Sequence, residues 1–426
     1  MNEKNQPKKY DLVLGGNNPP PVNGLVLGGI TGVKRRLESN NIEVIKSALS
    51  DAIAYKDEGL DLVIHALSNP SQETRKHAVN ILRNHKTVKA EQALLNYDLS
   101  SLFVQFSDWN LKDFNLEFYL DDPVDTSYRI DLRQFNNIIS ELEIIEPQGS
   151  KIEALYCPMW SDWYDYDRGE SLSYKECVNL LLDAHEQLPN LKALFLADET
   201  SDGYALGSRS DYKRYKIWMD EIRPLLEAYP KLELLQLQCH GGLDFSHIQH
   251  NCLKSLIVEA RSLSDYVLKN IMLLDLPELE YLELWLGKNR DYRRKKYRGR
   301  RNDIEFLNDL LMPLLFEDHF PNLKYLGLCS CEWADDLIDF LKNSPIIKRL
   351  RMLNLSRGTL TDKGAEILLN CPAINNLHTL NVSMNLLSPE MVNKLSQLNC
   401  NVIAEPQDIY YYNENYGTDR YLALYE

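Results

Sequence analysis

Cysteine and histidine residues gather in one short stretch, and they are the first candidates for chemistry. Cys239 and His240 are followed by His247, His250 and Cys252. Thiolate and imidazole groups are the ligands that zinc prefers in tetrahedral sites. The spacing matches no zinc-finger rule, however, and Cys252 directly precedes a leucine of the repeat described below. We therefore predict no bound metal and no cofactor, and a metal-dependent enzyme that uses His247 and His250 is an alternative.

Motifs that carry catalysis are missing from the sequence. It contains no G-x-S-x-G turn, no H-E-x-x-H helix and no Gly-Lys-Ser/Thr phosphate loop. The glycine-rich phrase Leu-Val-Leu-Gly-Gly occurs twice near the start, at Leu12 and at Leu25, but neither copy is followed by the lysine that would bind a phosphate. We predict that the chain is not an enzyme.

A run of basic residues is the second candidate for binding chemistry. Between positions 288 and 301 it holds nine cations and one acid, together with Tyr292 and Tyr297. Like charges repel, which favours an extended, solvated loop. Stacking of the tyrosines on bases would allow nucleic-acid binding, and the cations alone could dock an acidic protein partner. The basic residues are Lys288, Arg290, Arg293, Arg294, Lys295, Lys296, Arg298, Arg300 and Arg301.

The composition of the whole chain limits these possibilities. Its 426 residues suggest two or three domains. With 62 acidic against 47 basic residues the net charge is −15, which argues against a global electrostatic grip on nucleic acid or on an anionic membrane. No apolar run is long enough to span a bilayer, and the first residues form no secretory leader. Several of the eight cysteines lie in apolar segments, which is typical of reduced thiols in the cytosol.

A leucine phrase recurs through the last two thirds of the chain and predicts the elements that position these residues. The phrase consists of a leucine, any two residues, a second leucine, any one residue and a third leucine. Its last three copies begin 27 residues apart. The copies start at Leu191, Leu232, Leu253, Leu279, Leu323, Leu350 and Leu377, with a weaker one at Ile152. The pattern resembles a leucine-rich repeat of the long, ribonuclease-inhibitor-like type. That resemblance implies an α/β solenoid, a horseshoe with a parallel sheet inside and helices outside.

The geometry of a strand explains the phrase. Alternate side chains of a strand point to one face, so the second and third leucines face the core between strand and helix. A single unit cannot bury its apolar face, so units must stack. Asn or Cys commonly closes the turn at the ninth position, where this chain has Cys331 and Asn385. Ser388 and Pro389 are suited to begin the helix of the last repeat as its N-cap and first residue.

The residues between the leucines are expected to face outward on the concave side of the sheet. The middle of that surface is rich in aromatic and apolar side chains, which usually marks a contact surface. The alternative is that the chain covers the patch itself with its aromatic tail, Tyr410 to Tyr416. The candidate partner-binding residues are Tyr156, Phe195, Gln236, Ile257, Glu259, Tyr281, Glu283, Trp285 and Tyr325.

Helical periodicity precedes the repeats. Leu60, Val63, Ile64 and Leu67 have the spacing of one helix face, and after the break at 68–70 a second helix is expected to begin at the N-cap Ser71. The stretch from Asn69 to Ala78, Asn-Pro-Ser-Gln-Glu-Thr-Arg-Lys-His-Ala, is similar to the start of a HEAT repeat. The resemblance implies a short HEAT-like helical module, and a plain helical bundle is the alternative.

Several longer phrases are similar to a bacterial, cyanobacterial-type family of leucine-rich-repeat proteins of unassigned activity. Three of them are Leu188-Pro-Asn-Leu-Lys-Ala-Leu-Phe-Leu196, Leu276-Pro-Glu-Leu-Glu-Tyr-Leu-Glu-Leu284 and Phe320-Pro-Asn-Leu-Lys-Tyr-Leu-Gly-Leu328. The family implies no catalytic residues for this chain.

We predict five segments along the chain. They are a Gly/Pro-rich start at 1–32, a HEAT-like module at 33–100, a bridging or capping region at 101–150, the leucine-rich-repeat domain at 151–404 and an aromatic tail at 405–426. Together these features favour a non-catalytic, cytoplasmic scaffold that binds another protein on the concave face of its sheet. Nucleic-acid or acidic-partner binding by the loop 288–301 is the alternative.

Overall fold

A computed structural model describes residues 29–115, 126–130, 148–159, 174–198, 219, 221–239, 242–260, 263–287 and 303–407. The chain divides into two compact units, Met1–Leu102 and Phe103–Glu426. This division lies two residues beyond the expected end of the helical module at residue 100. Across the described ranges, no helix is both long and apolar enough to cross a membrane.

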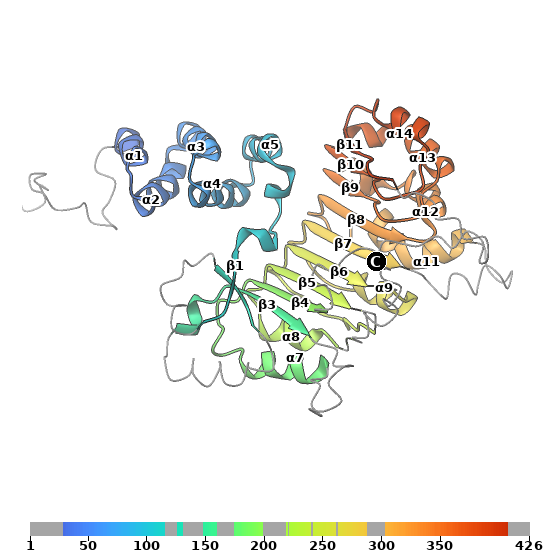
Figure 1. Cartoon of the computed structure of the whole chain (residues 1–426), viewed down its shortest axis with the longest axis horizontal. Coiled ribbons are helices and arrows are strands. Elements are labelled where there is room, and N and C mark those ends of the chain that lie inside the picture. Colours follow the sequence, from blue (N-terminus) through green and yellow to red (C-terminus); the bar gives the residue numbers. More distant parts are fainter. Residues whose placement is uncertain are drawn as a thin grey trace, which may run out of the picture. The chain divides into compact units, whose positions relative to one another are not determined.

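The first unit is helical, as the periodicity predicts (Figure 1). Val33, Leu49, Val63, Ala78 and Leu94 are among the residues of its buried core. Its helices are α1 (Gly29–Leu37), α2 (Ile42–Ala52), α3 (Lys56–His65), α4 (Gln72–His85) and α5 (Val88–Tyr97), with 3-10 turns η1 (Ile53–Tyr55), η2 (Ala66–Ser68) and η3 (Leu99–Leu102).

Polar caps set where these helices begin. The Oγ of Ser71 accepts a hydrogen bond from the backbone N–H of Thr74 at 3.3 Å, so the predicted cap of α4 is confirmed. Asn41 caps α2 and Thr87 caps α5 in the same way. Each cap supplies an acceptor for a first-turn N–H that has no partner inside its helix.

The second unit is built on one parallel sheet whose strands follow the order of the chain from β1 to β11. Figure 1 shows the strands side by side, with the helices of this unit on one side of the sheet. The strands are β1 (Asn110–Asp113), β2 (Thr126–Arg129), β3 (Ala154–Met159), β4 (Ala193–Asp198), β5 (Leu234–Cys239), β6 (Ser255–Ala260), β7 (Tyr281–Gly287), β8 (Tyr325–Cys331), β9 (Met352–Asn354), β10 (Thr379–Asn381) and β11 (Asn401–Ile403). A leucine-rich-repeat solenoid of the α/β class, preceded by a helical segment, is therefore confirmed.

Helices return the chain between most of the strands. They are α7 (Tyr174–Asp183), α8 (Arg223–Ala228), α9 (Asp265–Ile271), α11 (Asp303–Phe316), α12 (Ala334–Leu341), α13 (Asp362–Leu369) and α14 (Pro389–Leu395). Ser388 accepts a hydrogen bond from the N–H of Met391 at 3.2 Å, and Pro389 is the first residue of α14, as expected. One strand and one helix per repeat place a continuous core between the two layers.

The repeat leucines lie in that core. In β5, Leu235 and Leu237 are fully buried, whereas Gln236 and Gln238 between and after them are only half-buried. Strand pairing aligns Leu194, Leu235, Leu256, Leu282 and Leu326 as direct neighbours. The alternation of buried and half-buried residues is the pattern that the phrase predicts.

The sheet begins before the predicted repeat domain. Strands β1 and β2 lie in the stretch 101–150, which was expected to be a bridge, and β11 follows the last recognised repeat. In β2 the core position of the second leucine is held by Tyr128, which is paired with Leu155 and is 3% exposed. An aromatic residue fills the same position in the core, so the leucine phrase alone does not detect this strand.

Asn385 closes the turn after β10, as its position in the repeat predicts. Its Nδ2 donates to the carbonyl groups of Leu355 at 2.9 Å and Val382 at 3.0 Å, and its Oδ1 accepts from the N–H of Leu360 at 3.0 Å. The side chain is fully buried, so these bonds join backbone groups that would otherwise be unpaired. Gln407 continues this role at the C-terminal end, where its Oε1 accepts from the N–H of Asn385 at 3.2 Å.

Candidate functional site

Outward side chains of the sheet form columns on the face opposite the helices, here called the concave face. Each strand contributes alternate residues to that face, and the parallel register aligns them. The first column is Ser127, Ala154, Ala193, Leu234, Ser255, Tyr281 and Tyr325; the second is Arg129, Tyr156, Phe195, Gln236, Ile257, Glu283 and Gly327; the third includes Gln238, Glu259, Trp285 and Cys329.

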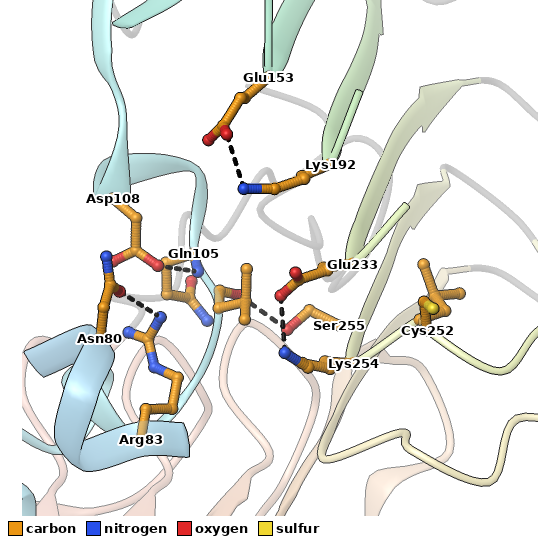
Figure 2. A network of polar contacts seen from close by, with 12 residues as sticks. Asn80, Arg83, Gln105, Asp108, Glu153, Lys192, Glu233, Cys252, Lys254 and Ser255 are labelled. Carbon is orange, nitrogen blue, oxygen red and sulfur yellow. Dashed lines mark hydrogen bonds and ion pairs between the residues drawn. The ribbon is translucent and has the colours of Figure 1, made fainter. Parts of the chain in front are cut away.

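Charged residues alternate in sign at the position just before the first column. The ion pairs are Glu153–Lys192, Glu233–Lys254 and Glu280–Lys324, with nitrogen–oxygen distances of 2.6, 2.7 and 3.7 Å. Figure 2 shows the first two pairs, the second beside Ser255. Because each carboxylate is paired with a lysine of the next strand, the charges along the N-terminal ends of these strands cancel one another.

A segment of the chain itself lies across the first column. We call Phe103–Trp109 the strap; it includes the 3-10 turn η4 (Phe106–Asp108) and leads directly into β1. Val104 packs with Ala154, Ala193 and Leu234, and its carbonyl group accepts a hydrogen bond from Ser255 Oγ at 2.7 Å. The small side chains of Ala154, Ala193 and Ser255 in the first column leave room for a second layer of chain.

Aromatic contacts fix both ends of the strap. The Phe103 ring meets the rings of Tyr281 and Tyr325 edge-on, with centroid distances of 5.3 and 5.8 Å. The Phe106 ring meets Tyr156 at 6.2 Å and Phe195 at 5.8 Å. Edge-to-face contacts at such distances stabilise aromatic pairs beyond the burial of their area.

The expectation that the whole aromatic centre is open to a partner is wrong. Tyr281 is 9% exposed, Tyr325 4% and Ile257 6%. The Tyr281 and Tyr325 rings stack on each other at 3.7 Å and are covered by Phe103 from the strap. The chain thus covers part of its own face with the strap, whereas the tail that the sequence suggested for this role lies outside the described residues.

The sequence holds a signal for the strap that was missed. Phe103, Val104 and Phe106 form an apolar run in the expected bridging region, and the first outward positions of four repeats are Ala154, Ala193, Leu234 and Ser255. Alanine and serine at these outward positions are too small to shield the backbone of the sheet from solvent. Apolar residues in a bridge together with small outward residues indicate that the bridge packs there.

A polar group occupies the rest of the face, around Glu283. Its carboxylate accepts hydrogen bonds from the Tyr281 hydroxyl at 2.9 Å, from the Tyr325 hydroxyl, and from Trp285 Nε1 at 2.8 Å. Burial raises the pKa of both tyrosines well above the usual value, so both stay protonated as donors. Gly327, opposite Glu283, leaves room for it, because a Cβ there would lie 2.8 Å from Glu283 Cγ.

Glu259 lies on the neighbouring strand, diagonal to Glu283. Its carboxylate accepts hydrogen bonds from Gln236 Nε2 at 2.8 Å and Gln238 Nε2 at 3.3 Å. Burial raises the pKa of Glu259 to about 7; the bond from Gln236 opposes this rise, the Glu283 carboxylate adds to it, and Arg357 opposes it. Glu259 therefore changes charge near neutral pH.

Trp285 and Arg357 complete the open part of the face. The Trp285 side chain is half-buried, and the Arg357 guanidinium lies over its ring at 5.3 Å from the centroid. We call Glu259, Glu283, Trp285 and Arg357 the polar patch. It combines carboxylates, a tryptophan ring and a cation, which are groups that bind charged side chains of other proteins.

Three solved structures are similar to this chain to different extents. A crystal structure of a protein from Bacteroides fragilis is 24% identical, with a TM-score of 0.52 over 67% of this chain and 75% of that one. An internalin from Listeria monocytogenes is 15% identical, with a TM-score of 0.31 over 82% of this chain and 94% of its own. Human 5T4 (trophoblast glycoprotein) is 16% identical, with a TM-score of 0.27 over 61% and 71%.

Neither a protein-family model nor a curated protein matches the chain. The similarity to the Bacteroides structure concerns the fold alone. The chemistry of the polar patch therefore follows from its own residues alone.

His250 of the cysteine and histidine cluster has a structural use. His250 is 4% exposed; its Nε2 lies 3.1 Å from the Tyr229 carbonyl oxygen and its Nδ1 3.1 Å from the Leu253 N–H. Burial lowers the pKa of His250, so the ring is neutral and bonds the backbone through both nitrogens. Among the described residues, no group of three or more His, Cys, Asp or Glu could hold a metal ion.

Three candidate segments lie outside the described residues. They are the basic loop from Lys288 to Arg301, the aromatic tail from Tyr410 to Tyr416, and the doubled phrase that begins at Leu12 and Leu25. His240 of the cysteine and histidine cluster lies outside as well.

Proposed function

We propose that this chain is a non-catalytic scaffold that binds another protein on the open part of its concave face. The proposal is supported above all by Trp285, a tryptophan left half-buried at the centre of a face whose neighbouring rings are covered. Tryptophan and arginine are the residues that most often dominate protein interfaces. The leucine-rich-repeat fold is consistent with such a role but does not decide it, because folds host many functions.

The partner would contact a smaller set of residues than the sequence suggests. Gln236, Gln238, Glu259, Trp285 and Arg357 have partly exposed side chains on the face. Three of the predicted residues are buried and would support the site without touching the partner; they are Tyr281, Tyr325 and Ile257. Phe195 and Tyr156 are half-buried beside Phe106 of the strap and would form the border of the site.

Two finer assignments belong to the same proposal. The helical unit is proposed to be HEAT-like because α4 begins at the HEAT-like stretch, with Ser71 as its cap. A cytoplasmic location of a bacterial protein is proposed from cysteines in apolar segments, such as Cys329 and Cys331, which are buried thiols.

Affinity purification from the native cell tests the proposal. We expect Trp285→Ala to reduce recovery of the partner at least tenfold, because truncating a central tryptophan removes most of its contact area. Tyr266→Ala is the matched control, since Tyr266 is 59% exposed on α9, away from the concave face. Equal recovery of the partner with both variants, by quantitative mass spectrometry, would remove the polar patch as the site.

A further inference from the structure

Negative charge gathers on the concave face without a basic partner on the adjacent strands. Glu259 on β6 is paired with Trp285, and Glu283 on β7 is paired with Ile257, so the two carboxylates lie diagonally across one strand pair. None of the ion pairs between described residues includes either carboxylate. This contrasts with the sheet edge, where Glu233 and Glu280 each have a lysine.

All the donors to these two carboxylates are neutral. Glu283 receives two hydroxyl groups and an indole N–H, and Glu259 receives two side-chain amides. Neutral donors orient a carboxylate, but they do not cancel its charge. A like charge on a neighbouring strand is unfavourable, so an added cation would relieve the repulsion between Glu259 and Glu283.

The ring of Trp285 already holds a guanidinium group of this chain. Arg357 CZ lies 5.3 Å from the ring centroid, within the range of a cation–π contact. No carboxylate of the described ranges forms an ion pair with Arg357. This contact already places one cation next to the two carboxylates, so a cation of a partner would compete with Arg357 for the Trp285 ring.

We propose that the polar patch binds an arginine or lysine side chain in a basic segment of the partner protein. This inference rests on the proposed function and names the chemistry of the partner. The cation would lie between the Glu259 carboxylate and the Trp285 ring. It would be favoured by the carboxylates and by the overall excess of 62 acidic over 47 basic residues, and opposed by Arg357. Charge complementarity of this kind selects partners and speeds their association.

The polar and titratable groups around Glu259 determine how binding of a cation depends on pH. Gln236 and Gln238 face it from β5, Glu283 from β7, Cys329 from β8, and Arg357 from the turn after β9. Cys329 is buried and its pKa is raised well above the usual value by burial, so it stays neutral. A bound cation favours the ionised form of Glu259, so its binding releases a proton, and affinity rises as the pH increases from 6 to 8.

The test measures binding of a fluorescein-labelled, capped octa-arginine peptide to the full chain by anisotropy. At pH 8 we expect Glu259→Gln to weaken binding about tenfold. Arg357→Gln is expected to strengthen it about threefold, because the competing cation is removed. Glu366→Gln, which removes an exposed carboxylate of the outer helix α13, should change it less than twofold. Between pH 8 and pH 6 the wild-type affinity should fall about fivefold, and that of Glu259→Gln should stay constant.

Opposite results would overturn the inference. Weaker binding by Arg357→Gln, equal effects of Glu259→Gln and Glu366→Gln, or no peptide binding by the wild-type chain would each exclude a basic segment of a partner protein at the patch. Binding that occurs only after 288–301 is replaced by a Gly/Ser linker would identify this chain's own basic run as the occupant and would overturn the proposal as well. If Trp285→Ala still abolishes partner recovery, the proposed function stands and only the basic partner is excluded.

Discussion

The first and third columns of the concave face come from the same strands but meet different surroundings. In the first column, Ala154, Ala193 and Ser255 are buried beneath the strap. In the third column, Glu259 and Trp285 are only half-buried and carry the polar patch. The two columns lie four positions apart along each strand, as Ser255 and Glu259 do in β6, so the repeat itself does not distinguish them.

The size of the outward side chain accounts for this difference. Alanine and serine let a second segment of chain approach the backbone of the sheet closely, whereas tryptophan and glutamate fill the space themselves. The strap therefore closes the first column and leaves parts of the second and third columns for a partner. A recognition surface in a repeat protein is thus defined by what the rest of the chain leaves uncovered.

Removing the anchor of the strap is the strongest way to break this comparison. Phe103 is 1% exposed and contacts Tyr281 and Tyr325. Phe103→Ala should lower the free energy of unfolding by about 3–5 kcal/mol, as for other buried phenylalanines. Urea unfolding followed by circular dichroism measures the loss. The control is Phe316→Ala, at a half-buried phenylalanine of α11 on the helix side, which should lower the free energy of unfolding by less. A loss under about 1 kcal/mol for Phe103→Ala would show that the strap is not anchored there.

The third column should respond to pH, unlike the first. Because the pKa of Glu259 rises from 4.5 to about 7 on folding, the native state holds a proton that the unfolded state has lost between these values. Stability therefore falls as the pH rises from 4.5 to 7. Glu259→Gln should be more stable than the wild type at pH 8 by about 2–3 kcal/mol, with a difference that vanishes below pH 4.5. Urea unfolding at several pH values checks this; a difference independent of pH would contradict it.

The repeat and its core could be predicted from the sequence because the leucine phrase reports directly on burial. Leu235 and Leu237 both lie in the core because residues two positions apart on a strand point to the same face. Strand β2 was not predicted, because Tyr128 takes the place of a leucine in the phrase. The helix caps and the turn residue were predictable as well. Ser71 and Ser388 each accept a hydrogen bond from the first turn of their own helix, and Asn385 bonds backbone groups of its own turn and of the neighbouring repeat.

The site was predictable only in part. Glu259, Glu283 and Trp285 follow from strand alternation, and the register places them as neighbours. Arg357 was missed because it follows the strand in a left-handed turn (φ 62°) and is not between two leucines. The burial of Tyr281 depends on Phe103, a residue 178 positions earlier in the chain, and periodicity carries no information on such distant contacts.

One hydrogen bond gives the finest test of the contrast between the columns. Ser255 is fully buried, and its Oγ donates to the Val104 carbonyl of the strap at 2.7 Å. Ser255→Ala leaves that carbonyl without its donor and should lower stability by about 1–2 kcal/mol in urea unfolding. Ser127→Ala is the matched control, since Ser127 is buried in the same column and, among the described residues, its Oγ has no hydrogen-bond partner. That variant should be neutral or slightly stabilising. Equal losses in both would mean that serine is retained in this column for its size alone, and that packing rather than hydrogen bonding holds the middle of the strap.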